Sequence, residues 1–184
     1  MKIKNAISAF AFAAMVALSA PAFAAGNLYE TLKSDPQFST LVSVIDATGT
    51  KHNYTSGTRT VFAPTNAAFE AIKGGYQDML GKTDRTNTQA LLLYQIVPGT
   101  HTPASLAGKT TTVKTLQKDP VTISDAGGKL HYGDGKFGGT QAGDALTASN
   151  GVIIPIDGFP VPVFDTPDDG AAVPPSVMTR TPLN

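Results

Sequence analysis

The chain has 184 residues, no cysteine, and 14 basic residues against 14 acidic ones, which gives a formal net charge of zero. This composition excludes a disulfide scaffold, and the lack of a basic run argues against nucleic acid or an anionic membrane surface as the partner. The length is enough for one domain with a substantial hydrophobic core.

The first 24 residues have the features of a secretory signal peptide. Lys2 and Lys4 give a positive start, Ala6 to Ala20 is apolar, and Ala22-Phe23-Ala24 fits the pattern that precedes a cleavage site. The apolar run is shorter than the roughly 20 residues that a membrane-spanning helix needs. We therefore expect a cut after Ala24, with an uncleaved anchor as the alternative. The mature chain would lack a membrane span and would be periplasmic or secreted.

Helical signals dominate the first part of the mature chain. Asn27 to Lys33 predicts a short helix capped by Asn27. A second helix is predicted from an N-cap at Asp35 to a left-handed C-cap at Gly49. The polar segment Lys51 to Arg59 is expected to be a loop.

The stretch from Thr60 to Ile72 joins a strand to a helix. Thr60 to Ala63 favours a buried strand, and Pro64 ends it because proline cannot donate to a sheet ladder. Thr65 or Asn66 can then cap the helix that follows.

A break and a further helix come next. Gly74-Gly75 interrupts the chain, and Tyr76 to Leu80 is expected to form one helical turn. A capping box, Thr86-x-x-Gln89, predicts the start of a buried helix that Pro98-Gly99 stops.

From Lys109 onward the sequence changes to short strands separated by turns. The predicted strands are Thr110–Leu116, Val121–Ser124, Lys129–Tyr132, Ala145–Ala148 and Val152–Ile156. The glycine-rich run from Gly133 to Gly139 is read as a hairpin loop, because it lacks the spacing of a phosphate cradle or a calcium loop. Helices followed by strands predict an α+β fold, a small sheet sandwich with helices at one side.

Proline crowds the C-terminal segment, Phe159 to Asn184, which shows little apolar periodicity. We expect it to be extended or disordered. It is either a plain terminus or a spacer and docking segment, since polyproline-like segments bind at low entropic cost.

Three motifs resemble those of the fasciclin family, the FAS1 domain. They are T-V-F-A-P-T-N-A-A-F at Thr60, L-L-L-Y-Q-I-V-P-G at Leu91 and N-G-V-I-I-P-I-D at Asn150. The resemblance covers Asn27 to Val163. It implies a wedge-shaped β-sandwich with several short α-helices packed at one side, a FAS1-like domain over residues 25–163 and a proline-rich flexible tail over 164–184. The leader is bacterial in style.

The resemblance places the structural or recognition positions in these motifs: Thr60, Phe62, Pro64, Thr65, Tyr94, Gln95, Asn150, Gly151 and Asp157. Buried polar groups usually survive only when they are hydrogen-bonded. We therefore expect Thr65, Asn150 and the Tyr94-Gln95 pair to bond to one another or to nearby backbone, tying the helices to the last strand.

Two positions depart from the family pattern. Gln95 and Ile154 stand where the family commonly has histidine. The Tyr-His region has been implicated in integrin binding by animal relatives, so that role is not transferred to this chain. Pro155 predicts an edge position or a bulge for its strand. An exposed edge there would be a candidate surface for strand addition.

The sequence predicts neither an enzyme nor a metal or cofactor site. His52, His101 and His131 do not show the i, i+4 spacing of a helical metal pair. There is no G-x-S-x-G elbow, and the pair Asp168-Asp169 falls in the expected tail.

The residues and the resemblance together predict a non-catalytic extracytoplasmic binding module. Its partner would be a protein or another cell-surface component, in cell adhesion or surface contact. The alternative is a small apolar ligand such as a carotenoid, which some fasciclin-like proteins of photosynthetic organisms hold. Phe62, Phe69 and Ile96 would line its cleft. An enzyme is the third hypothesis.

Overall fold

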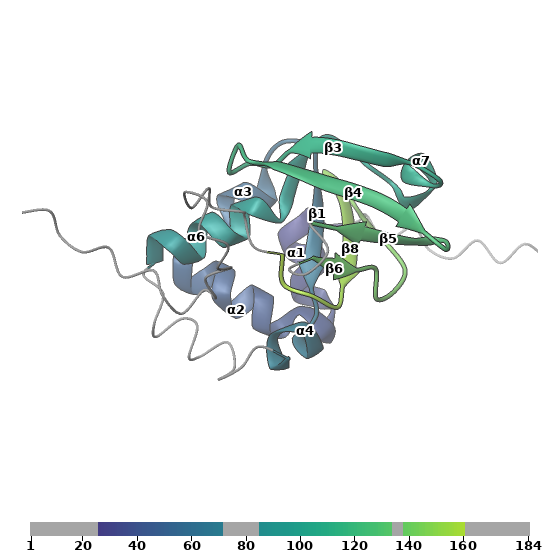
Figure 1. Ribbon diagram of the computed structural model, residues 1–184. Helices are drawn as coiled ribbons and strands as arrows, with labels where there is room; N and C mark the ends of the chain where they lie inside the picture. Colours follow the sequence, from purple (N-terminus) through teal and green to yellow (C-terminus); the bar gives the residue numbers. More distant parts are fainter. Residues whose placement is uncertain (1–25, 72–84, 134–137, 161–184) are drawn as a thin grey trace, which may run out of the picture.

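The computed structural model describes residues 26–71, 85–133 and 138–160 (Figure 1). The predicted signal peptide, the break at Gly74-Gly75 with the turn after it, and the tail over 164–184 with Asp168-Asp169 lie outside these residues. Within them, no helix has the length and apolar character needed to cross a bilayer.

The described residues form two four-stranded sheets. The central sheet has the order β2-β1-β8-β7, and the outer sheet has the order β3-β4-β5-β6. The central strands are β1 (Arg59–Pro64), β2 (Ile96–Pro98), β7 (Leu146–Ala148) and β8 (Gly151–Ile156). The outer strands are β3 (Thr110–Lys114), β4 (Pro120–Ala126), β5 (Lys129–Tyr132) and β6 (Gly139–Thr140). Among these described strands, only the β1–β8 pair is parallel.

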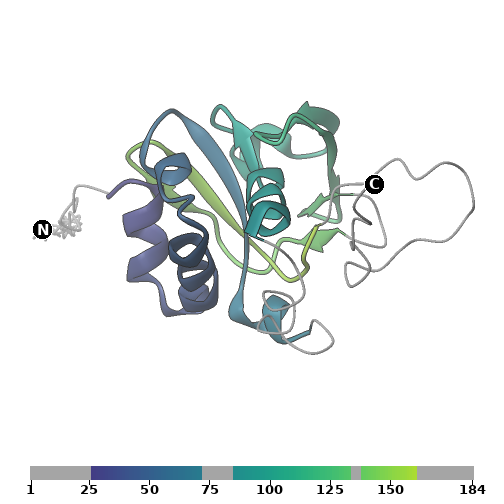
Figure 2. The same cartoon turned by 90° about the vertical axis from the view of Figure 1, so that its left-hand side faces the viewer.

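The helices are short, and most of those near the N-terminus gather on one side of the central sheet (Figure 2). They are α1 (Leu28–Ser34), η1 (Pro36–Phe38), α2 (Ser39–Thr48), α3 (His52–Thr55), α4 (Asn66–Glu70), α6 (Arg85–Tyr94) and α7 (Pro103–Leu106). The central sheet therefore lies between helices and the outer sheet. The predicted α+β sandwich with helices at one side is confirmed.

The central sheet is buried on both faces. On β1, Val61 and Ala63 pack into the core shared with the helices, whereas Phe62 packs into the core between the sheets. On β8, Ile153 faces the helices and Ile154 faces the outer sheet. Strands covered on both faces need apolar side chains at successive positions. This explains why both motifs read as continuous apolar runs.

Two predicted helix caps are confirmed. The Asn27 side chain accepts a hydrogen bond from the Glu30 N–H at the start of α1. Gly49 ends α2 in the left-handed conformation, with φ of 73°. The Asp35 side chain also caps as expected, but only the 3-10 turn η1 follows it, and the α-helix begins at Ser39.

Other boundaries differ from the sequence prediction. His52 to Thr55 is helical where a loop was expected. Thr86 lies inside α6, and the Gln89 side chain donates to the Thr48 carbonyl at the end of α2, so the capping-box prediction is wrong. The helix ends at Tyr94 because β2, which was not predicted, pairs with β1. The strand β6 and the helix α7 were also not predicted.

The predicted edge position of Pro155 is wrong for the strand as a whole, because β8 lies between β1 and β7. The pairing of β8 with β7 nevertheless stops at Ile153. Beyond it, the Pro155 carbonyl accepts a hydrogen bond from the Ala142 N–H at 2.9 Å. A strand residue aims its N and its carbonyl to the same side. The Pro155 nitrogen, which has no hydrogen to donate, therefore faces the side of β8 on which β7 no longer pairs. Ala142 lies on that side.

The first residue of β8 fixes how closely the two parallel strands approach. Gly151 pairs with Arg59 and has a φ of 157°. A Cβ at this position would overlap the Arg59 carbonyl oxygen. The Arg59 N–H also donates to the Asn150 carbonyl at 3.0 Å. The junction can form only with glycine at residue 151.

We expect Gly151→Ala to lower the free energy of unfolding by more than about 3 kcal/mol, because the backbone must shift to relieve the overlap. Gly127→Ala is the matched control. It also has a positive φ, 67°, but no heavy atom lies within 4 Å of its Cβ position. The control should lose about 1 kcal/mol from backbone strain alone. Urea denaturation measures both variants, and equal losses would contradict the steric explanation.

Candidate functional site

Asn150 links the N-terminal end of β8 to the helical layer. Its Oδ1 accepts a hydrogen bond from the Leu28 N–H at 2.8 Å. Its Nδ2 donates to the carbonyls of Tyr54 at 3.3 Å and Gly57 at 3.1 Å. One side chain thus satisfies a free N–H in the first turn of α1, a carbonyl in α3 and a carbonyl in the segment just after α3. This is the link between helices and last strand that the sequence predicts.

Thr60 makes a similar link on the other flank of β1. It is fully buried, and its hydroxyl donates to the Gly99 carbonyl at 2.9 Å and accepts from the His101 N–H at 2.8 Å. The side chain therefore holds the segment after β2 against β1. A buried hydroxyl that both donates and accepts is fully compensated for its loss of water.

The C-terminal ends of β1 and β8 are joined through backbone and through Asp157. Pro64 pairs with Ile156, and the Thr65 N–H donates to the Ile156 carbonyl at 3.1 Å. The Thr65 side chain makes no capping hydrogen bond, although Thr65 occupies the N-cap position of α4. The Asp157 carboxylate accepts from the Thr140 N–H at 2.7 Å, which ties β8 to β6 of the outer sheet.

Three aromatic residues fill the core between the sheets. The Phe62 and Tyr132 rings stack with centroids 3.9 Å apart, and Tyr94 meets Tyr132 edge-on. The Tyr132 hydroxyl donates to the Tyr94 carbonyl, and the Tyr94 hydroxyl lies 3.4 Å from the Pro120 carbonyl. Burial raises the pKa of Tyr132 well above its ordinary value, so the phenol stays protonated and can donate.

Gln95 differs from the other motif residues. It is fully buried, yet among the described residues neither its Nε2 nor its Oε1 has a hydrogen-bond partner. Only its backbone is engaged, with its carbonyl accepting from the Phe62 N–H at 2.9 Å. The expectation that the Gln95 side chain ties elements together is therefore wrong.

The apolar cleft expected from the sequence is not formed by the residues named for it. Phe62 lies in the core between the sheets, whereas Phe69 and Ile96 lie in the core on the helical side. All three are at most 1% exposed. They fill two separate cores on opposite faces of the central sheet, and they do not line a common opening.

Asn66 is a structural residue whose hydrogen-bond partners could not be predicted from the sequence. Its Oδ1 accepts from the Thr40 N–H, and its Nδ2 donates to the Pro36 carbonyl and the Ser39 hydroxyl. It therefore caps α2, which lies 26 residues earlier, and not its own helix. The polar pair Thr65-Asn66 after Pro64 was the available signal, but the partners of Asn66 depend on the tertiary fold.

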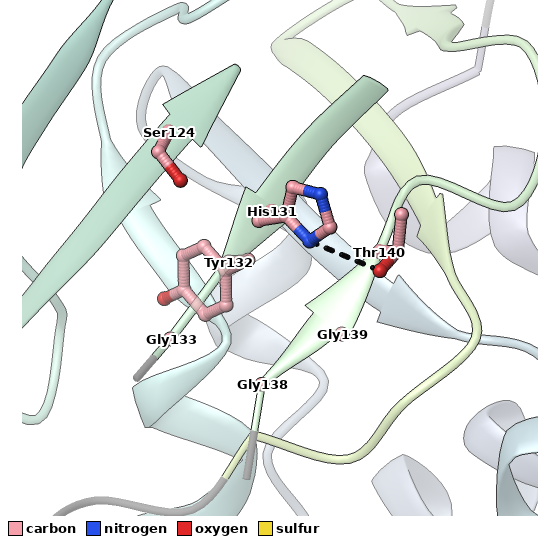
Figure 3. A pocket seen from close by; sticks show the side chains of 7 residues that line it. All are labelled: Ser124, His131, Tyr132, Gly133, Gly138, Gly139 and Thr140. Carbon is pink, nitrogen blue, oxygen red and sulfur yellow. Dashed lines mark hydrogen bonds between the residues drawn. The ribbon is translucent and has the colours of Figure 1, made fainter. Parts of the chain in front are cut away.

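The outer sheet carries a surface hollow with a volume of about 200 Å³ (Figure 3). Ser124, His131 and Thr140 line it from three neighbouring strands, and the backbones of Gly133 and Gly138 border it. The Thr140 hydroxyl lies 3.1 Å from His131 Nδ1. These side chains point away from the core, because Ile123 and Tyr132 beside them are buried between the sheets.

The sequence did not identify this hollow. The glycine run from Gly133 to Gly139 was expected to be a hairpin loop, and the strands on its two sides do pair antiparallel, with Tyr132 opposite Gly139. The loop residues 134–137 themselves lie outside the described part. The alternation of Ser124 and His131 with apolar neighbours was the available signal, but only the pairing of β4, β5 and β6 brings the polar side chains together.

The three histidines stay apart from any cluster of potential metal ligands. In the portion of the chain that the structure describes, no group of three His, Cys, Asp or Glu residues could hold an ion. His101 Nε2 lies 3.2 Å from the Pro98 carbonyl, and His52 belongs to α3.

The two sheets, the helical layer and the glycine-asparagine junction define a single α+β module of the FAS1 class. The sequence model described as Fasciclin domain matches residues 36–162, and the chain belongs to this family. The resemblance drawn from the three motifs is thus confirmed.

Two relatives and one solved structure show the range of this similarity. Human periostin is 32% identical over 143 residues, which cover 77% of this chain and 16% of periostin. Immunogenic protein MPB70 of Mycobacterium bovis is 31% identical over 172 residues, covering 73% of this chain and 86% of MPB70. A solved FAS1 domain pair from the insect cell adhesion molecule fasciclin I matches with a TM-score of 0.59 and 15% identity, over 76% of this chain and 51% of that chain. The last likeness shows the fold alone.

We expect Asn150→Ala to lower the free energy of unfolding by about 1–3 kcal/mol, because it leaves the Leu28 N–H without its partner. Asn150→Asp is the informative companion. It keeps the acceptor for Leu28 but sets a carboxylate against the carbonyls of Tyr54 and Gly57, so it should be no more stable than the alanine variant. Chemical denaturation tests both, and an unchanged transition for Asn150→Ala would refute this role.

Gln95→Met should raise the free energy of unfolding by roughly 1 kcal/mol, since it removes two buried polar atoms that lack partners at similar side-chain volume. Gln37→Met makes the same substitution at an exposed position of η1, where it removes a solvent-exposed hydrogen bond to Asp35, and should stay within about 0.5 kcal/mol of the parent. The thermal midpoints of the two variants give the comparison. A destabilised Gln95→Met would mean that the amide has a partner.

Proposed function

We propose that this protein is a non-catalytic extracytoplasmic binding module that acts in cell adhesion or surface contact, with a protein or another cell-surface component as partner. The observation that carries the proposal is that polar residues of the family motifs are buried or hydrogen-bonded within the fold. Thr60 is fully buried, and the side chains of Asn150 and Asp157 form hydrogen bonds with other segments of the chain. The motifs build the scaffold and leave its outer faces for contact.

Family membership supports the same function. The solved FAS1 pair comes from a protein described as an insect cell adhesion molecule, and periostin and MPB70 share the domain. In this proposal the leader is cut after Ala24, the domain spans residues 25–163, and residues 164–184 act as a spacer. The motif positions serve as structural supports of the contact surface.

The small apolar ligand remains the second candidate function. Its support is limited to the family, because Phe62, Phe69 and Ile96 are enclosed in two cores. An absorption spectrum of the purified protein distinguishes the two candidates, since a bound carotenoid absorbs visible light. A colourless protein that retains cells favours the adhesion module.

The test of the proposal is retention of intact source cells on a surface coated with the purified protein. We expect the native protein to retain several times more cells than a coat of the Gly151→Ala variant, which has nearly the same composition but a weakened fold. Equal retention by the two coats, or turnover of a substrate by the native protein, would count against an adhesion module.

A further inference from the structure

The exposed side of the outer sheet carries a row of polar side chains in register. Thr110 pairs with Ser124, Ser124 with His131, and His131 with Thr140. Residues directly opposite one another in antiparallel strands point to the same side. The four side chains therefore cross the sheet in one line, spaced by roughly 4.8 Å from strand to strand. We call this line the polar row.

A second line of hydroxyls runs beside the polar row. Thr112 pairs with Thr122, and the Gly133 N–H donates to the Thr122 carbonyl from the next strand. Glycine adds no side chain at this point, which leaves the hollow open next to Ser124 and His131 (Figure 3). The exposed side thus offers several hydroxyls, which both donate and accept, around one shallow depression.

Two lysines stand at opposite corners of this exposed side. Lys114 lies four residues beyond Thr110 on β3, and Lys129 lies two residues before His131 on β5, in the opposite direction along the sheet. Both are exposed. With a rise of about 3.4 Å per residue, the two positions are on the order of 20 Å apart along the strands. The polar row lies between them.

Two acidic side chains at the edges of this side accept hydrogen bonds from backbone N–H groups. Asp125 accepts hydrogen bonds from the N–H groups of Gly108 and Gly128 at the rim, and Asp157 accepts from the Thr140 N–H. The outward positions of the described strands β3, β4, β5 and β6 hold no Asp or Glu. The charged side chains at the outward positions of these strands are therefore Lys114 and Lys129, and both are positive.

We infer that the exposed side of the outer sheet binds an acidic polysaccharide, an extended sugar chain with carboxylate or sulfate groups. The sugar hydroxyls would pair with the polar row, and the anionic groups would meet Lys114 and Lys129. This inference rests on the proposed function and names the cell-surface component. A nucleic acid fits less well, because the outward positions offer no Phe, Tyr or Trp ring for base stacking.

The test uses the full protein with polygalacturonate as the probe, in affinity electrophoresis and titration calorimetry at low salt. Dextran serves as the neutral polymer and poly-glutamate as the anionic peptide. We expect binding to polygalacturonate that weakens as salt is added, and little binding to the other two. Equal binding to dextran, or equal binding to poly-glutamate, overturns the inference.

Two pairs of variants locate the surface. Lys114→Gln with Lys129→Gln should weaken binding roughly tenfold, as expected for two exposed ion pairs. Lys33→Gln with Lys51→Gln removes the same charge from the helical side and should leave the affinity unchanged. Thr122→Val with Ser124→Ala keeps every charge and should weaken binding several-fold. Melting curves establish that all variants fold. Equal losses in the two lysine pairs would also overturn the inference.

The outcomes separate this inference from the proposed function. If source cells are retained by the native protein but polygalacturonate is not bound, the polysaccharide site is wrong and the adhesion module stands. If the polymer is bound at Lys114 and Lys129 but cells are not retained, the adhesion role is wrong and the polysaccharide site stands without it.

Discussion

The parallel pairing of β1 with β8 is the constraint on which the rest of the structure depends. These strands are distant in sequence, both are buried on two faces, and their approach requires glycine at residue 151. Asn150, the residue before it, then fixes α1 and α3 against the sheet. The helical core and the core between the sheets are thus both anchored on one strand pair.

This arrangement explains why the family motifs contain polar residues within apolar runs. Thr60 and Asn150 satisfy backbone groups that the central sheet and the short helices leave without partners. Short helices have a large share of such groups, because each terminus leaves several N–H or carbonyl groups unpaired. Gln95 follows a different rule, since its buried amide has no partner among the described residues. The polar positions of a family motif are therefore not equivalent.

A fixed interior leaves recognition to the surfaces that the motifs do not occupy. The outer sheet is attached to the central sheet through Tyr132, Phe62 and Asp157, and its other side is exposed. Rigid strands hold hydroxyls at regular spacing there, which is how an otherwise neutral protein can offer an ordered contact surface. Contact residues on such a side can change without disturbing either core.

The sequence by itself determined the elements whose signals are local. The caps at Asn27 and Gly49 depend on residues within one turn, and β5 was bounded correctly by its alternation and turns. The apolar runs of β1 and β8 also predicted burial. Only the tertiary structure decided that β8 is central despite Pro155, that β2 ends α6, that Asn66 caps α2, and that Ser124, His131 and Thr140 form one row. Each of these depends on partners far away in the chain, and a single sequence contains no record of that pairing.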